Sequence, residues 1–189
     1  MKHIINFLGQ VDESRIAHLS SAISGAMAAD ASELEIHISS FGGNLYAGIA
    51  AYNIIRSLPI PVHAHNIGNI DNMSLLMYLA ASTRTTCLYS RFYVGGLNLA
   101  FNQAQYIPHQ QVMEAIESYD LDIKTCAQIF IERTRCSKVL VDVFEMLQNK
   151  PRVLDYAAAY EYGITTSETL NGSWDSRMID VPSERWWHV

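Results

Sequence analysis

The chain has 189 residues, of which 49% are hydrophobic and 17% are charged, a composition that fits one domain with a sizeable core. A formal net charge of -6 with scattered Lys and Arg residues lacks the basic surface that nucleic-acid binding requires. No apolar run of about 18 residues could cross a membrane and no cleavage site of a secretory signal follows the N-terminus, so we expect a soluble, cytoplasmic protein.

The first half of the chain alternates short apolar strands with amphipathic helices. Strands are predicted over residues 4–8, 34–38, 62–67 and 91–94. Between them, Asp12 can cap a helix with an apolar face, a second helix spans residues 47–58, and residues 68–72 turn into a third over 73–81. Because parallel strands require crossover connections, these repeated βα units predict an α/β domain with a largely parallel sheet.

The second half predicts one long helix over residues 110–133, since apolar residues recur there at spacings of four and three: Val112, Ile116, Tyr119, Ile123, Cys126 and Phe130. Two interpretations stay open. The seam covers the core of its own domain, or part of it packs against another subunit. Shorter helices are expected over residues 137–147 and 154–162, the latter ended by Gly163. The domain is predicted to span residues 1–170, and the Trp-containing tail over 171–189 shows no periodicity.

Neither the cysteines nor the histidines form a recognisable metal or redox motif. The three cysteines are odd in number and widely spaced, which favours reduced thiols: Cys87, Cys126 and Cys136. His63, His65 and Asp71 lie close in sequence, but no further ligand follows at a recognisable spacing. We therefore expect no metal and no cofactor.

Four segments carry motifs of a known family. Residues 38–58, ISSFGGNLYAGIAAYNIIRSL, are similar to a strand that ends at a Ser-Pro-Gly-Gly turn before an Ala-Gly-x-Ala-x-Tyr helix, with Phe41 in place of the proline. Residues 65–82 are similar to a nucleophile turn, Gly-x-x-x-Ser-Met-x-x-x-x-Leu-x-x-Ala, and residues 89–96 to a strand that ends in a catalytic histidine. Residues 151–164 are similar to Asp-Arg-x-x-x-x-Ala-x-x-Ala-x-x-Tyr-Gly-Leu. In order and spacing, residues 4–166 resemble the ClpP-like serine peptidases, the proteolytic subunit of the ATP-dependent Clp protease.

The resemblance implies a ClpP/crotonase-like fold of repeated βα units with a long protruding helix, and it assigns the site. The serine of the family's catalytic triad falls on Asn72, the histidine on Gly95 and the aspartate on Pro151. The N–H groups of Gly43 and Met73 fall on the oxyanion hole. Since a carboxamide is a poor nucleophile and the other two positions offer no proton acceptor, the chain is predicted to be a pseudoenzyme.

Alternatives stay open at the same site. Ser74 could act as a rearranged nucleophile with His65 as its base, although two helical steps turn Ser74 about 200° away from Asn72. The Gly43 and Met73 N–H pair could instead serve a crotonase-type acyl-CoA enzyme. A peptide could lie along the strand at Gly42 and Gly43 by main-chain hydrogen bonds. The amide of Asn72 could simply satisfy the backbone of its own turn.

The resemblance also implies assembly. Self-association into a ring is expected, with a heptamer and a stacked double ring as candidate forms and an active ClpP paralogue as a candidate partner. The family's chain usually begins earlier, with an axial loop that contacts the partner ATPase. The start of this sequence therefore argues against docking to a Clp ATPase.

Overall fold

The computed structural model describes residues 1–97, 107–134, 139–148 and 150–167. A six-stranded sheet forms its centre, in the order β1-β2-β3-β5-β6 with β4 paired to β3. The strands are β1 (Lys2–Leu8), β2 (Glu33–Ser40), β3 (Val62–Asp71), β4 (Thr83–Thr86), β5 (Arg91–Val94) and β6 (Arg152–Leu154). The helices are α1 (Glu13–Ala28), α2 (Leu45–Arg56), α3 (Met73–Ala80), α4 (His109–Thr134), α5 (Val139–Gln148) and α6 (Tyr156–Glu161).

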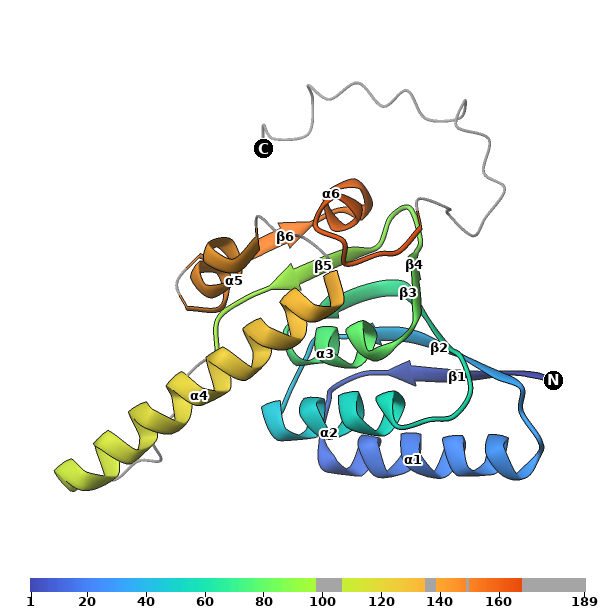
Figure 1. Cartoon of the computed structure of the whole chain (residues 1–189), viewed down its shortest axis with the longest axis horizontal. Coiled ribbons are helices and arrows are strands. Elements are labelled where there is room, and N and C mark those ends of the chain that lie inside the picture. Colours follow the sequence, from blue (N-terminus) through green and yellow to red (C-terminus); the bar gives the residue numbers. More distant parts are fainter. Residues whose placement is uncertain (98–106, 135–138, 149, 168–189) are drawn as a thin grey trace, which may run out of the picture.

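The predicted α/β architecture of repeated βα units is confirmed. Strands β1 to β5 pair in parallel, and α1, α2 and α3 provide the connections between successive strands (Figure 1). Two of these helices begin at side-chain caps. The Asp12 carboxylate accepts a hydrogen bond from the Arg15 N–H at 2.8 Å, as predicted, and Asn44 accepts one from the Ala47 N–H at 3.0 Å. Each cap stabilises its helix by about 1 kcal/mol.

Strand β2 shows how the sheet separates an apolar from a polar face. Leu34, Ile36 and Ile38 are fully buried in one core with residues of α1 and α2. Their neighbours point to the opposite side, because successive side chains of a strand alternate between faces. We call that side the polar face and define it by Glu35, His37, His65 and Thr85, which lie on β2, β3 and β4.

Three features of the sheet differ from the prediction. β3 runs through to Asp71, although residues 68–72 were expected to be a turn, because the strand changes partner from β4 to β5 after an irregular register step. β4 was not predicted, since its sequence TRTT lacks an apolar alternation. β6 pairs antiparallel with β5 where a helix from residue 154 was expected, and the helix begins only after its cap at Asp155.

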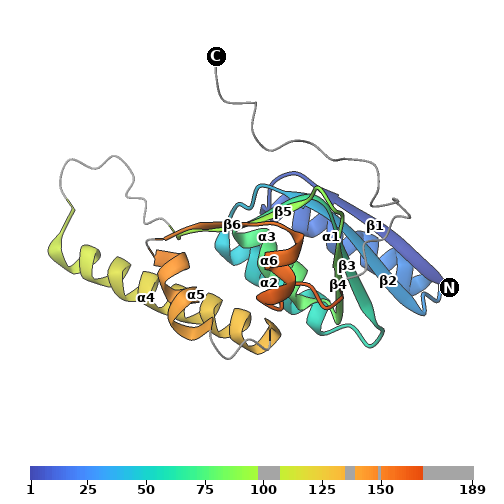
Figure 2. The same ribbon diagram turned by 90° about the horizontal axis from the view of Figure 1, so that it is seen from above.

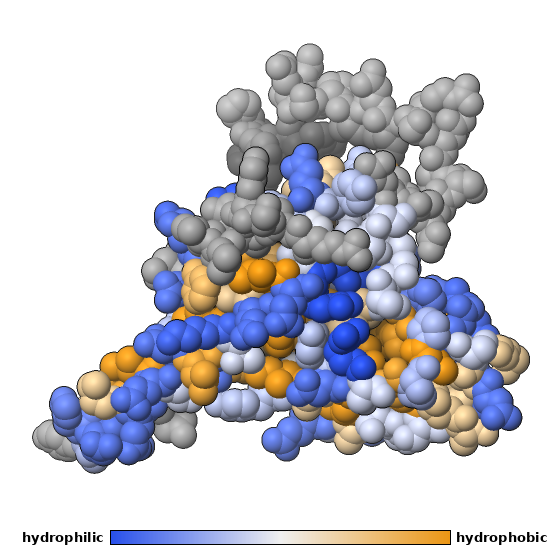
Figure 3. Space-filling view, in the orientation of Figure 1, coloured by the Kyte–Doolittle hydropathy of each residue, from blue (hydrophilic) through white to orange (hydrophobic). Residues whose placement is uncertain are grey.

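Helix α4 is confirmed as a single long helix, and its two halves differ in environment. Its C-terminal half lies on the body of the molecule, where Ile123, Cys126 and Phe130 are buried. Its N-terminal half projects away from the body in both views (Figures 1 and 2). There Val112 is only partly buried and Ile116 is 43% exposed. On the face shown in Figure 3, a band of hydrophilic side chains follows α4, with apolar surface on both sides of it.

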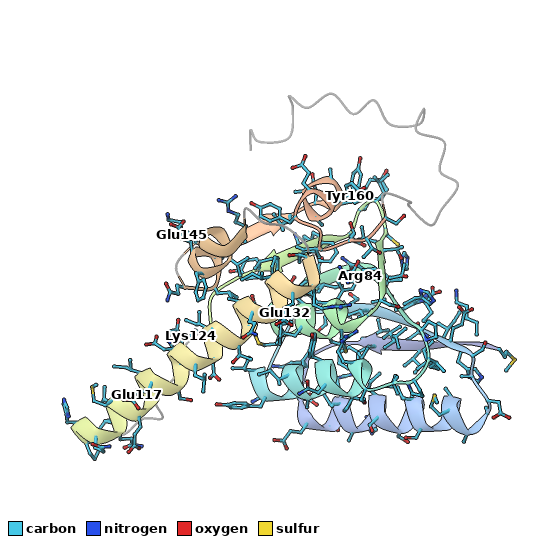
Figure 4. The ribbon with its side chains drawn as sticks, viewed as in Figure 1. Arg84, Glu117, Lys124, Glu132, Glu145 and Tyr160 are labelled. Atoms are coloured by element: carbon cyan, nitrogen blue, oxygen red, sulfur yellow. The ribbon has the colours of Figure 1, made fainter. Side chains whose placement is uncertain are left out.

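Two arginines, Arg84 of β4 and Arg133 of α4, connect α3, α4 and the end of the described chain; Figure 4 labels Arg84. Arg84 is only 3% exposed, and its guanidinium donates to the carbonyls of Ile164 at 2.6 Å and Ala81 at 3.0 Å. Arg133 donates to the carbonyl of Leu79 at 2.8 Å and also to that of Ala81. The carbonyls at the C-terminal end of α3, which have no partners within the helix, are thereby satisfied.

The remaining predictions concern thiols, membranes and the tail. Cys87 and Cys126 are free thiols, whereas Cys136 lies outside the described residues. The same is true of most of the tail and of the boundary expected at residue 170. Within the described ranges, the structure contains no helix whose length and hydropathy would let it cross a bilayer.

Candidate functional site

Asn72 occupies a sharp turn between β3 and α3. Its backbone has φ 46° and ψ -111°, a conformation that non-glycine residues adopt only when the surrounding structure enforces it, at a cost on the order of 1–3 kcal/mol. In the α/β-hydrolases, a strained strand-to-helix turn of this kind exposes a nucleophile at the top of a sheet. The turn geometry is therefore present with a carboxamide in place of a nucleophile.

The side chain of Asn72 is engaged by a neighbouring strand. Its Oδ1 accepts a hydrogen bond from the Gly95 N–H at 2.9 Å, and the backbone N–H of Asn72 donates to the Tyr93 carbonyl at 2.9 Å. It does not cap α3, so the amide satisfies the backbone after β5 and not that of its own turn. A Cβ at Gly95 would lie 2.3 Å from the Tyr93 ring and 2.9 Å from Asn72 Oδ1. Tyr93 and the amide thus fill the space into which a side chain at position 95 would extend.

Pro151 reaches the same place from β6. In the antiparallel β5–β6 pair, Val94 lies opposite Arg152, so one further step sets Gly95 opposite Pro151. Asn72, Gly95 and Pro151 therefore converge at one end of the sheet. Gly95 has no side chain, and neither the Asn72 amide nor the Pro151 ring can accept a proton from a nucleophile and hold it, which a hydrolytic triad requires.

The double glycine forms the facing wall of the site. Gly42 and Gly43 have φ +80° and +152°, and a Cβ at Gly42 would approach the Asp71 carbonyl to 2.7 Å and Asn72 Cβ to 3.2 Å. Val11 and Gly43 form a parallel β-bridge, in which the Val11 N–H donates to the Gly42 carbonyl and the Val11 carbonyl accepts from the Asn44 N–H. In this pattern the N–H of Gly43 points away from Val11. Met73 begins α3, so its N–H has no acceptor within the helix. Both backbone donors that the resemblance assigns to an oxyanion hole thus lie on segments that adjoin Asn72.

A comparison with protein-family models matches the Clp protease family over residues 1–166. The chain belongs to the Clp protease family. A ClpP1 point mutant from Listeria monocytogenes has a similar fold, with a TM-score of 0.67 and 17% sequence identity over 86% of this chain and 88% of that chain. A search of the curated proteins found no match.

Ser74, the alternative nucleophile of this Clp protease family member, is buried and stabilises the turn before α3 by hydrogen bonds to the backbone of Asp71. It is 0% exposed, and its Oγ accepts from the Asp71 N–H at 3.0 Å and donates to the Asp71 carbonyl at 2.8 Å. His65, the base considered for that alternative, contacts Thr85 and Cys87 instead. Among the described residues, no serine hydroxyl forms a hydrogen bond with a histidine.

Asp71 and the two histidines of β3 do not assemble a metal site. His63 Nε2 lies 3.4 Å from a carboxylate oxygen of Glu33, away from the partners of His65. Burial raises the pKa of Asp71, against the opposing charge of Arg91, and its Oδ1 is buried without a hydrogen-bond partner. No group of three potential metal ligands occurs in the part of the chain that the structure describes.

Tyr93 is the site residue that the sequence analysis missed. It stands two residues before Gly95, so strand alternation would have placed the two positions on one face of β5. That signal indicated proximity. It did not indicate that the ring would turn toward the space beside Asn72.

Proposed function

We propose that this chain is a catalytically inactive ClpP-like subunit that assembles with further subunits in a ring and retains a cleft able to bind an extended peptide. The cytoplasm is the compartment we propose, since the sequence pattern favours reduced thiols. An active ClpP paralogue is the proposed partner in a mixed ring, and docking to a Clp ATPase is not part of the proposal.

The hydrogen bond from the Gly95 N–H to Asn72 Oδ1 is the observation that carries the proposal. Acyl transfer needs a hydroxyl, an imidazole to take its proton and a carboxylate to orient that imidazole. Here an amide oxygen is bonded to backbone where the imidazole would begin. Loss of a triad residue costs on the order of 10⁶ in turnover, and an oxyanion hole with a binding cleft supports only about 10³ to 10⁴ over water.

Restoring the serine alone tests this proposal. Asn72→Ser supplies a hydroxyl but no base, so fluorogenic peptide hydrolysis should stay at the background of wild type, and Ser74→Ala should not change it. Measurable turnover by the wild-type chain that Ser74→Ala abolishes would contradict the proposal. It would establish instead the rearranged serine hydrolase.

Peptide binding rests on the backbone at Gly42 and Gly43, where an extended chain could add main-chain hydrogen bonds beside Asn72. Calorimetry with oligopeptides should detect binding without turnover. The absence of binding at millimolar peptide would remove this part of the proposal and leave assembly alone.

The second candidate is a crotonase-type acyl-CoA enzyme, which the placement of the Gly43 and Met73 N–H groups beside Asn72 favours. Two backbone donors can polarise a thioester carbonyl without a triad. Binding of a coenzyme A thioester, measured by calorimetry, would support this candidate over the inactive subunit.

Self-association is supported by the projecting half of α4. Met113 and Ile116 are 42% and 43% exposed there, so apolar surface stands clear of the domain's own core. Such surface favours an interface between copies.

A further inference from the structure

A second cluster of reactive side chains lies outside the Asn72 site. His65 of β3 stands opposite Thr85 of β4, and its Nδ1 lies 2.7 Å from Thr85 Oγ1. Its other ring nitrogen, Nε2, lies 3.3 Å from Cys87 Sγ. The backbone fixes this geometry, since the Cys87 N–H donates to the Asn66 carbonyl at 2.9 Å just beyond the end of β4. A thiol, an imidazole and a hydroxyl thus form one hydrogen-bonded chain.

The chain of contacts gives the thiol proton an acceptor within reach, the imidazole of His65. When the proton of neutral His65 is on Nδ1 and is donated to Thr85 Oγ1, the lone pair of Nε2 faces Cys87 Sγ. Burial, followed by the nearby His37, lowers the pKa of His65, against the opposing charge of Glu35. The imidazole is therefore neutral at pH 7 and available as a base.

The carboxylate of Glu35 can stabilise the positive charge that the transfer places on His65, against the opposing effect of His37. The ring of His37 lies 5.5 Å from that of His65, edge to face. Glu35 accepts from His37 at 2.7 Å and also pairs with Lys2, so a carboxylate stands behind the two histidines. A nucleophile within reach of a base that a third group orients is the arrangement by which side chains of this kind are activated.

We propose that Cys87 is a thiol nucleophile assisted by His65, positioned by Thr85, and that it forms mixed disulfides with small disulfide molecules. The S–H proton passes to His65 Nε2, and the thiolate attacks one sulfur of the disulfide. The new S–S bond forms as the old one breaks, and the other half leaves as a thiolate that takes up the proton. The small disulfide is the oxidant, so no other reagent is needed.

The partial exposure of Cys87 sets it apart from the second described cysteine. Cys126 is 2% exposed on the buried face of α4, and burial, followed by the charge of Asp122, raises its pKa to about 12. Cys126 should therefore react slowly and serve as an internal reference. The proposal uses no residue of the Asn72 turn, so it stands or falls independently of the proposed function.

The test follows thiol release from 5,5'-dithiobis(2-nitrobenzoic acid), a small aromatic disulfide, with the folded full-length chain at pH 7. One fast thiol is expected, which mass spectrometry of the modified peptides should map to Cys87, and Cys87→Ser should abolish it. His65→Gln should slow it at least about 10-fold, because the base is lost. His63→Gln is the matched control on the same strand and should leave the rate unchanged.

Three results would overturn the proposal. They are a fast thiol that maps to Cys126 or Cys136, an unchanged rate in folded His65→Gln, or an equal loss of rate in His63→Gln. Should His65→Gln not fold, Thr85→Val takes its place, since it keeps the shape of the side chain but removes the hydroxyl that orients the imidazole. That variant should measurably lower the rate at which Cys87 reacts with the disulfide, and an unchanged rate would also overturn the proposal.

Discussion

At the scale of single residues, Asn72 combines a strained backbone with a hydrogen bond to Gly95. Asparagine tolerates positive φ better than most residues, and the bond offsets part of the remaining strain. Asn72→Ala should lower the free energy of unfolding by about 1–3 kcal/mol, because it removes both advantages. Asn72→Gly, which relieves the strain and loses only the bond, should cost less. Urea unfolding measures both, and an Asn72→Ala variant as stable as wild type would refute this account of the turn.

His65 gives a prediction about pH. Burial lowers the pKa of His65 in the folded protein, whereas an unfolded histidine titrates at about 6.5. As the pH falls below about 6.5, the unfolded chain takes up a proton that the folded chain does not, so the free energy of unfolding decreases down to the pH of the folded pKa. In His65→Gln, the free energy of unfolding should decrease less steeply as the pH falls below about 6.5. Unfolding curves at a series of pH values would show this difference. An equally steep decrease in the variant would mean that His65 is not buried in its neutral form.

At the scale of elements, the sequence predicted the helices and strands whose apolar residues recur at a regular spacing. The helices and the strands with strong apolar runs were found, and two of the positions that the motifs single out, Asn72 and Gly95, are joined by a hydrogen bond. The rest depends on contacts distant in sequence. β4 has only four polar or charged residues and is recognisable only by its pairing with β3. β6 has three residues and forms only because β5 lies beside it.

The two arginines that connect α3 with α4 illustrate the same dependence, because Arg84 joins segments 49 and 80 residues away in sequence. Arg84→Met should lower the free energy of unfolding by on the order of 3 kcal/mol, since several buried carbonyls would lose their donor. Arg91→Met is the matched control. Arg91 is exposed and donates to Asn69 Oδ1 at 3.0 Å, so its loss should cost less than about 1 kcal/mol. Thermal unfolding of the two variants would distinguish them, and equal losses of stability would contradict the role given to Arg84.

At the scale of the whole molecule, we expect copies of the chain to associate through the projecting half of α4. Ile116 continues the apolar seam of the helix beyond the core of its own domain. Ile116→Glu should therefore shift the mass in solution toward the monomer, whereas Ser118→Glu, a charge on the opposite side of the projecting half, should not. Sedimentation at micromolar concentration measures the mass. A wild-type monomer, or equal behaviour of the two variants, would argue against assembly through this seam.

The claim on which the functional account depends is that no serine of the folded chain is activated. Intact-mass analysis after incubation with a fluorophosphonate, which labels activated serines, tests it most directly. The account predicts no added mass on the wild-type chain. A stoichiometric adduct on Ser74 or any other serine would contradict it and identify a working hydrolase on the Clp protease fold.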